Sequence, residues 1–435
     1  MDLFSGRLAR FIVNLVLIIC LGINCLNSLA STSNAQTSEV KNSTLFENSS
    51  KRNFDRKDIS KVREYVKKEK RLQPVTTITR ESISTESMLT PLATGTFQVQ
   101  PILFVPQDMQ EASNNTQAIN DSFQIIRRWY SGALEQNNNG YNLNVADTIV
   151  YKASHPFSYY KCINHETTCD NFDGVWENVQ LELLNAGYPL WTPGYSHVIM
   201  VKGAGGWAGS SCSPNCYTNW PSPGPASTSG VSILGDWALD GISGTVNPDC
   251  FAAIGTACYQ DPQRGALGHE LGHTFGLAHA NDQEGSLMYA WYLFPYVSLM
   301  ETSGNQEKSM IRNGSSFFTA TPCTYDSSLV EMVQPASVKT STQFTSTFNV
   351  MNYGFCKWTA NKTGLYLLRD KVWGISSKVL TKDVYPAQSN TFSLLLKSPL
   401  IGRLKLPAIK MSDWQMRKNT VFFGPIFGSA ITITR

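Results

Sequence analysis

Strong net charge is missing from this chain of 435 residues, which carries 36 Lys and Arg against 33 Asp and Glu, a net charge of +3. A general nucleic-acid binder needs a clear excess of basic side chains, so the balance argues against that class. A membrane-spanning apolar run is missing too. The run near the start, Phe11–Ile23, is broken by Asn14 and is shorter than the roughly 20 residues that a spanning helix needs. We therefore expect no nucleic-acid partner and no stable membrane span.

The first 35 residues have the pattern of a secretory signal. Arg7 and Arg10 form a basic start, the apolar run follows, and small residues at positions 28–30 and 33–35 offer two cleavage sites. The alternative is an uncleaved anchor, which the short length of the run disfavours. We predict a protein that is exported, either to the extracellular space or to a periplasm.

Cysteine is absent between positions 26 and 161 but is frequent afterwards. Eight cysteines follow the signal, and an even number in an exported chain predicts up to four disulfides. Closeness in sequence favours the pairs Cys162–Cys169, Cys212–Cys216, Cys250–Cys258 and Cys323–Cys356 among the possible connectivities. A cysteine metal site at Cys212 and Cys216 is disfavoured, because no second pair and no histidine lies close to them in the sequence.

Histidine is scarce, with six in the chain, yet three fall within the segment HELGHTFGLAH at positions 269–279. On a helix, His269 and His273 project from one face, so both imidazoles can reach one Zn²⁺ at about 2.0–2.1 Å. Gly276 is expected to end the helix, since only glycine takes a positive φ without cost, and the chain then returns His279 as a third ligand. Three protein ligands with one open position predict a catalytic zinc site.

Glu270 follows the first ligand directly and can face the open side of the metal. Zinc would act as a Lewis acid and lower the pKa of its bound water to about 7. A carboxylate in that place would take the proton of this water. Glu270 is therefore the predicted catalytic residue, and a purely structural zinc would not need it.

With Gly285-Ser-Leu-Met-Tyr289 shortly after the third histidine, the segment resembles the metzincin zinc endopeptidases. The resemblance implies an α+β catalytic domain with a mixed sheet, a zinc helix and a methionine turn. It makes Met288 the apolar floor under the histidines, with an ordinary core methionine as the alternative. The matrixin branch is most similar, although Ala280 replaces its usual Ser and its cysteine switch is absent. Ala290 stands where astacins and serralysins place an oxyanion-stabilising Tyr, so that role is not carried over.

Composition changes divide the chain into four parts. Residues 1–35 are the signal, and residues 36–94, which are polar and Ser/Thr-rich, are a pro-segment or a linker. Residues 95–320 are the expected metzincin-like catalytic domain. Residues 321–435 carry short alternating segments that predict an all-β sandwich.

Hydrophobic periodicity places the elements of the catalytic part. Strands are predicted at 97–105, 141–151, 197–201 and 231–235, and helices at 115–136, 176–184 and 306–312. Residues 203–230, dense in Gly, Pro and Ser, are expected to form an irregular loop. By analogy with the metzincins, the strand at 231–235 is expected to lie at the sheet edge and to pair with an extended peptide substrate.

Two groups of side chains admit two interpretations each. Asp236 and Asp240 are candidate ligands for a structural Ca²⁺, but without a Gly-punctuated loop ordinary surface acids are favoured. An aromatic cluster follows the methionine turn at Trp291, Tyr292, Phe294 and Tyr296. Burial in the core is the favoured interpretation of this cluster, and the wall of a substrate pocket is the other.

The last hundred residues resemble the four-tryptophan, immunoglobulin-like domain found in some autophagy receptors and attached to bacterial secreted enzymes. The resemblance rests on the order of short segments at 350–358, 385–387, 399–402, 414–416 and 423–425. Three Trp lie in this part of the chain: Trp358, Trp373 and Trp414. It implies a module that binds a protein or surface partner and holds no catalytic residue. A packing domain that stabilises the protease is the alternative.

Together these features predict a secreted zinc metalloendopeptidase that acts on protein or peptide substrates. Zn²⁺ is held by His269, His273 and His279, and Glu270 is the base. Two alternatives are an extracellular adhesion or binding protein with a structural zinc, and a processing peptidase with one narrow target.

Overall fold

A five-stranded sheet lies at the centre of the first half of the chain. The computed structural model describes residues 97–161, 172–213, 227–245, 260–280, 285–301, 306–369, 372–400 and 407–435. The strands run in the order β3 (Ile149–Lys152), β1 (Gln98–Val105), β4 (Tyr195–Val201), β6 (Ser229–Leu234) and β5 (Ala208–Ser213). The first four are parallel, and β5 runs antiparallel to β6 at one edge. The sheet is therefore mixed, as expected.

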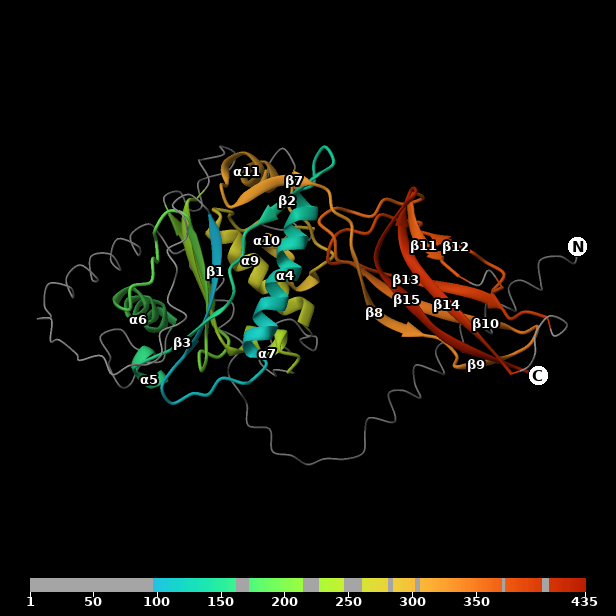
Figure 1. Cartoon of the computed structure of the whole chain (residues 1–435). Coiled ribbons are helices and arrows are strands. Elements are labelled where there is room, and N and C mark those ends of the chain that lie inside the picture. Colours follow the sequence, from blue (N-terminus) through green and yellow to red (C-terminus); the bar gives the residue numbers. More distant parts are fainter. Residues whose placement is uncertain are drawn as a thin grey trace, which may run out of the picture. The chain divides into compact units, whose positions relative to one another are not determined.

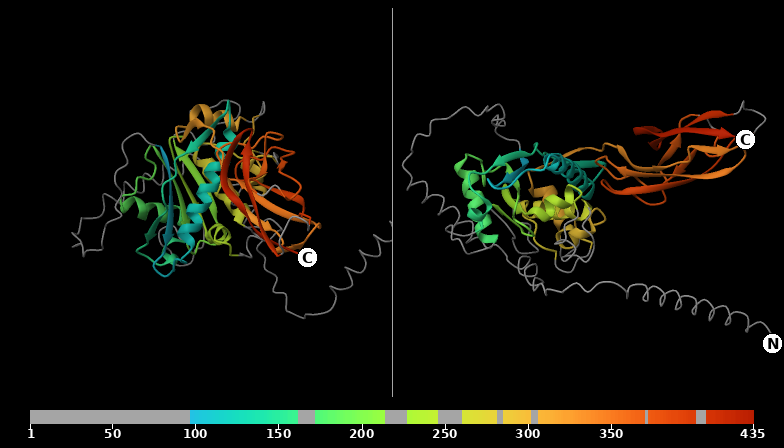
Figure 2. Two further views of the ribbon diagram at one scale, coloured as in Figure 1. Left: turned by 45° about the vertical axis from the view of Figure 1, so that its right-hand side comes forward. Right: turned by 90° about the horizontal axis from the view of Figure 1, so that it is seen from below.

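Helices cover both faces of this sheet (Figure 1, Figure 2). One face carries α4 (Asn115–Leu134), α7 (Asp236–Ile242) and α9 (Gln260–Thr274), and the other carries α5 (Phe157–Tyr160) and α6 (Phe172–Asn185). Strand β4 shows the reason: Val198 and Met200 pack in the core on the α4 and α9 side, while Ile199 and Val201 pack in the core on the α6 side. Successive side chains of a strand point to opposite faces, so a strand that is apolar throughout needs both faces covered.

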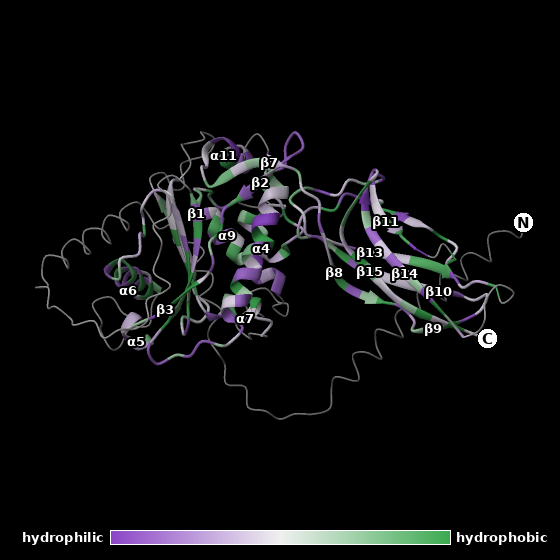
Figure 3. Ribbon diagram, in the orientation of Figure 1, coloured by the Kyte–Doolittle hydropathy of each residue, from purple (hydrophilic) through white to green (hydrophobic). Residues whose placement is uncertain are grey.

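Figure 3 shows hydrophobic and hydrophilic residues interleaved along helix α4, as expected of an amphipathic helix. Ile119, Phe123, Ile126 and Trp129 are buried at the helical spacing from which the helix was predicted. The observed helix ends two residues before the predicted end at position 136.

Two predictions about strands were wrong. The strand predicted at 141–151 is two strands, because β2 (Asn139–Leu143) pairs with β7 (Phe318–Pro322) and β3 pairs with β1. The strand predicted at 231–235 is β6, which lies inside the sheet. The strand at the edge next to β6 is β5, within the segment expected to be an irregular loop, and its backbone pairs with β6 from Ala208 to Ser213.

The segment in which the methionine turn was expected follows α9 and is the last part of the expected catalytic domain before β7. It contains α10 (Leu287–Ala290), the 3₁₀ helix η2 (Trp291–Leu293) and α11 (Glu307–Gly314). The predicted closing helix is confirmed in α11. The chain then passes through β7 into the C-terminal β region.

The C-terminal β region, residues 325–435, contains two sheets. One has the order β13 (Ser389–Lys397), β10 (Gln343–Asn352) and β8 (Ser327–Val333). The other has the order β12 (Ser377–Val379), β11 (Thr363–Leu367), β14 (Ala408–Lys418), β15 (Val421–Thr434) and β9 (Ser337–Lys339). Trp358, Trp373 and Trp414 are fully buried in one core with apolar side chains from both sheets. Two β-sheets around a shared core agree with the all-β expectation.

One predicted disulfide is confirmed: Cys323 is bonded to Cys356. Cys212 is also disulfide-bonded, with a partner outside the described residues. The pairs Cys162–Cys169 and Cys250–Cys258, and likewise Cys216, lie outside the described residues, as do the signal and the 36–94 segment. Within the part of the chain that the structure describes, no helix is both long and apolar enough to cross a membrane.

Candidate active site

The three histidines converge on one point. Helix α9 carries His269 and His273, and the Nε2 atoms of these residues are 3.0 Å apart. Gly276 has φ 97°, so the chain leaves the helix there in the left-handed region. The turn brings His279 back, with its Nε2 atom 3.0 Å from that of His273. The three predicted ligands therefore form a group of possible metal ligands whose atoms all lie within 4.8 Å.

Backbone carbonyls hold two of the imidazole rings in place. The Nδ1 atom of His269 is 3.0 Å from the carbonyl oxygen of Leu287, and Nδ1 of His273 is 2.7 Å from that of Leu277. A carbonyl only accepts, so each Nδ1 carries the proton and each Nε2 offers its lone pair to the common point. Burial lowers the pKa of His269 to about 3 and that of His273 well below its ordinary value. Both rings are thus neutral at pH 7, as ligand imidazoles must be.

Glu270 points from α9 toward the edge strand β5. The hydroxyl of Ser210, on β5, donates to Oε2 of Glu270. Burial raises the pKa of the Glu270 carboxyl to about 7, and the bond from Ser210 lowers it. A carboxyl group with a pKa near neutrality can both accept and release a proton at pH 7. Sequence reasoning missed Ser210, because the small residues of β5 carry no strand pattern.

Met288 lies against α9 beside the ligands. It is fully buried, and its Sδ atom is 2.5 Å from the position that a Cβ atom would take at Gly272. Gly272 precedes His273 directly, so glycine at this position allows the thioether to pack against the helix at the level of the ligands. From α4, the buried Tyr130 hydroxyl donates to the carbonyl of Gly268 at 2.7 Å, next to His269. No pattern in the sequence indicated this contact between Tyr130 and Gly268.

A buried carboxylate stabilises the methionine turn. The hydroxyl of Ser286 donates to Glu307 Oε1 at 2.8 Å and accepts from the backbone N–H of Met288 at 3.0 Å. The N–H of Met300 donates to Glu307 Oε2 at 2.7 Å. Glu307, on α11, is fully buried. Since the neighbouring Leu287 carbonyl orients His269, this network links α11 to the first of the three histidines.

Replacing Glu307 by Gln exchanges one of its accepting oxygens for an amide NH₂ group that donates. We expect the free energy of unfolding to fall by about 1–3 kcal/mol, because one buried donor of this network then loses its acceptor. Loosening the support of His269 should also weaken zinc binding about 10- to 100-fold. Denaturant titration and competition with a chelator measure the two effects. Glu301→Gln, at an exposed carboxylate that also contacts α11, is the control and should change neither quantity.

The aromatic cluster divides between core and surface. Phe294 is buried, as the favoured interpretation required, but Tyr292 and Tyr296 are 39% and 70% exposed. Trp291 packs against the core from a partly buried position. The prediction of core burial for the whole cluster was therefore wrong, because the short 3₁₀ helix turns neighbouring side chains to opposite sides. Ala290 is fully buried and offers no group to an oxyanion.

The other metal expectations find no support in the described residues. Asp236 pairs with Lys202 at 3.2 Å and accepts from the N–H of Gly203 at 2.6 Å. Neither Asp236 nor Asp240 belongs to a group of three possible ligands there. Glu135 does lie beside Cys323 and Cys356, but those sulfurs are joined in the disulfide.

No family model matches the sequence, and no curated protein matches it. Among solved structures, OgpA from Akkermansia muciniphila is 13% identical over 77% of this chain and 93% of that chain, with a TM-score of 0.32. Metalloproteinase-II from Bacteroides fragilis is 16% identical over 54% and 56% of the two chains, with a TM-score of 0.26. A β-glucosidase from Listeria innocua covers 80% of this chain at 10% identity and a TM-score of 0.17, with 47% of that chain covered. Likenesses this low carry no argument about function, which rests on the histidine and carboxylate geometry.

Proposed function

We propose that this chain is a secreted, zinc-dependent endopeptidase of the metzincin type. The observation that carries the proposal is the convergence of three imidazole Nε2 atoms, in steps of 3.0 Å, together with the buried carboxyl group of Glu270 on the same helix as two of them. The cysteines that follow the signal-like start, with a disulfide at Cys323–Cys356, support export. The C-terminal β region is proposed to be immunoglobulin-like.

The donor set fits Zn²⁺. Three neutral imidazoles are typical ligands of this ion, and a site with three protein ligands leaves one position open. When bound, zinc supplies a Lewis acid for the scissile carbonyl and lowers the pKa of a water molecule. The hydrogen bonds from His269 and His273 to backbone carbonyls keep the ligand nitrogens aimed at the ion without rearrangement.

Glu270 moves the proton in this proposal. Its Oε2 atom accepts from Ser210, so Oε1 takes the proton of the attacking water and returns it to the leaving amine. Ser210 holds the carboxylate in one orientation during both transfers. Because proton transfer needs contact within about 3 Å, an oriented carboxylate acts better than a freely rotating one.

Strand β5 is the proposed binding edge for the substrate. One side of β5 pairs with β6, and no described strand pairs with its other side. An extended peptide can add to such an edge through main-chain hydrogen bonds. Ser210 lies on this strand, so a peptide bound there would run past Glu270.

The full chain, incubated with casein or quenched-fluorescence peptides, tests the proposal. We expect hydrolysis that is lost with a zinc chelator and restored by added Zn²⁺, because without the ion the water molecule is not activated. Hydrolysis that survives complete zinc removal would contradict it. If the zinc-loaded chain is inactive, removing residues 36–94 distinguishes a latent enzyme, which then becomes active, from a protein without peptidase activity.

A further inference from the structure

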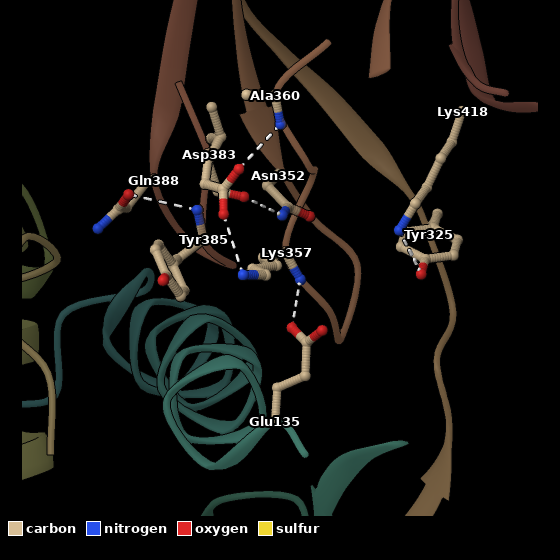
Figure 4. Close-up of polar contacts among 10 residues, drawn as sticks. Glu135, Tyr325, Asn352, Lys357, Ala360, Asp383, Tyr385, Gln388 and Lys418 are labelled. Atoms are coloured by element: carbon tan, nitrogen blue, oxygen red, sulfur yellow. Dashed lines mark hydrogen bonds and ion pairs between the residues drawn. The ribbon is translucent and has the colours of Figure 1, made fainter. Parts of the chain in front are cut away.

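The C-terminal β region contacts helix α4 and its C-cap over a defined set of residues. We call this set the α4 junction: Arg127, Arg128, Ser131, Gly132 and Glu135 on one side, and Tyr353, Phe355, Lys357 and Pro386 on the other. Figure 4 shows one of its bonds, in which the backbone N–H of Lys357 donates to the Glu135 carboxylate at 2.8 Å. The hydroxyl of Ser131 donates to the carbonyl of Phe355 at 2.8 Å.

Arg128 contacts the C-terminal β region in two ways. Its guanidinium lies 3.7 Å from the centre of the Tyr353 ring, and its Nε donates to the Tyr353 carbonyl at 2.8 Å. Arg127 lies 5.2 Å from the centre of the Phe355 ring. Arginine is suited to such places, because its planar group can stack on an aromatic ring and donate hydrogen bonds together.

The packing at the junction is close enough to require glycine. A Cβ atom at Gly132 would lie 2.3 Å from Cδ of Pro386, and a proline ring cannot swing away as a flexible side chain can. Ala387, the next residue, is buried in the same apolar core as α4 and α9. The core of the catalytic half thus includes a residue from the C-terminal β region.

Gln388, the residue after Ala387, contacts the segment that follows η2. Its Nε2 donates at 3.1 Å to the carbonyl oxygen of Pro295, which also accepts from Trp129 Nε1 of α4 at 3.3 Å. Figure 4 shows that its Oε1 faces the backbone N–H of Tyr385, at 3.3 Å, within the same turn. Pro295 lies in the segment after η2, seven residues beyond Met288. The C-terminal β region therefore holds the segment that leaves the methionine turn.

We propose that the C-terminal β region is docked on α4 and contributes to the activity of the peptidase. Within it, Gln388 is a positioning residue for the segment 291–297. This role rests on the proposed function. It differs from the role of a separate targeting module that a flexible linker joins to the catalytic half. The Pro295 carbonyl has donors on two elements, so losing Gln388 should let the segment shift without unfolding it. The segment packs on α9, because a Cβ atom at Gly265 would lie 2.0 Å from the carbonyl oxygen of Trp291 and 2.7 Å from Cβ of Phe294. A shift of the segment is therefore expected to alter the surface beside the helix that carries the histidines and to leave Glu270 in place.

Gly132→Ala tests the docking by the sign of a melting-temperature change. In a helix without a neighbour, alanine is favoured over glycine and the Tm should rise by roughly 2–4 °C. If Pro386 is seated on α4, the added methyl group overpacks the contact and the Tm should instead fall by roughly 4 °C or more. A rise would overturn the proposal. This measurement needs no activity, so it stands whether or not the chain proves to be a peptidase.

Gln388→Ala tests the positioning role, with Gln415→Ala as its matched control. Gln415 makes a similar bond, from its Nε2 to the carbonyl of Gly424 at 2.7 Å, wholly within the C-terminal β region. We expect Gln388→Ala to raise KM about 3- to 10-fold with kcat little changed, and to speed amide hydrogen exchange in residues 291–297. Gln415→Ala should alter neither. Unchanged amide hydrogen exchange in Gln388→Ala, or equal effects of the two substitutions, would overturn the positioning role of Gln388. If the wild type is inactive but Gln388→Ala shows the expected exchange, the result counts only against the proposed function.

Discussion

Glu270→Ala is expected to abolish peptide hydrolysis while the protein still binds one zinc ion. The carboxylate is not among the converging ligands, so its loss leaves the three imidazoles intact. Loss of a general base lowers kcat by about 10²- to 10⁴-fold. The measurement is kcat on a quenched peptide, with zinc content determined on the same preparation.

Asp261→Ala is the matched control, because it removes an exposed carboxylate from the first turn of the same helix, α9. It should leave both kcat and zinc content unchanged. Hydrolysis by Glu270→Ala at the wild-type rate would remove Glu270 from the mechanism. Loss of zinc together with activity would mean that the carboxylate acts on the metal site instead.

Glu270→Ala is also expected to change how the free energy of unfolding depends on pH. Burial raises the pKa of Glu270 in the folded, metal-free protein from its ordinary value of 4.5 to about 7. The folded state therefore keeps this proton to a higher pH than the unfolded state does. The contribution of the protonated Glu270 to the free energy of unfolding is lost as pH rises from about 4.5 through 7. In Glu270→Ala this part of the decline should disappear from urea unfolding curves measured on metal-free protein.

His279→Ala is expected to lower zinc affinity by more than about 100-fold, since a direct ligand matters at least as much as the groups that orient one. Activity should fall with occupancy. His279 lies beyond the end of α9 and is exposed, so its removal should disturb the fold little. Zinc content after dialysis, and affinity by chelator competition, measure the effect.

His155→Ala serves as the control for the loss of a histidine. His155 stacks on Tyr159 with ring centres 3.8 Å apart and takes no part in the metal group. This variant should keep one zinc per chain. Full zinc occupancy in His279→Ala after the same dialysis would show that the third ligand has been assigned wrongly.

The sequence by itself predicted the arrangement of the histidines and Glu270, because that arrangement is local. His269, Glu270 and His273 lie within two turns of one helix, so their relative placement follows from helical geometry alone. Gly276 and His279 follow within six residues, where a positive φ at glycine is enough to reverse the chain. The amphipathic pattern of α4 and the alternating strands of the C-terminal β region were predictable for the same reason. Each of these patterns repeats within a single element.

Tertiary structure alone decided what supports that site. Ser210 and Glu270 are 60 residues apart, and β5 is a strand only because β6 supplies its hydrogen bonds. The burial of Glu307 under the methionine turn and the contact of Gln388 with Pro295 likewise join segments that no local pattern relates. An isolated carboxylate, serine or glutamine in a sequence gives no sign of its partner, because its role depends on which distant donor or acceptor the fold brings within 3 Å.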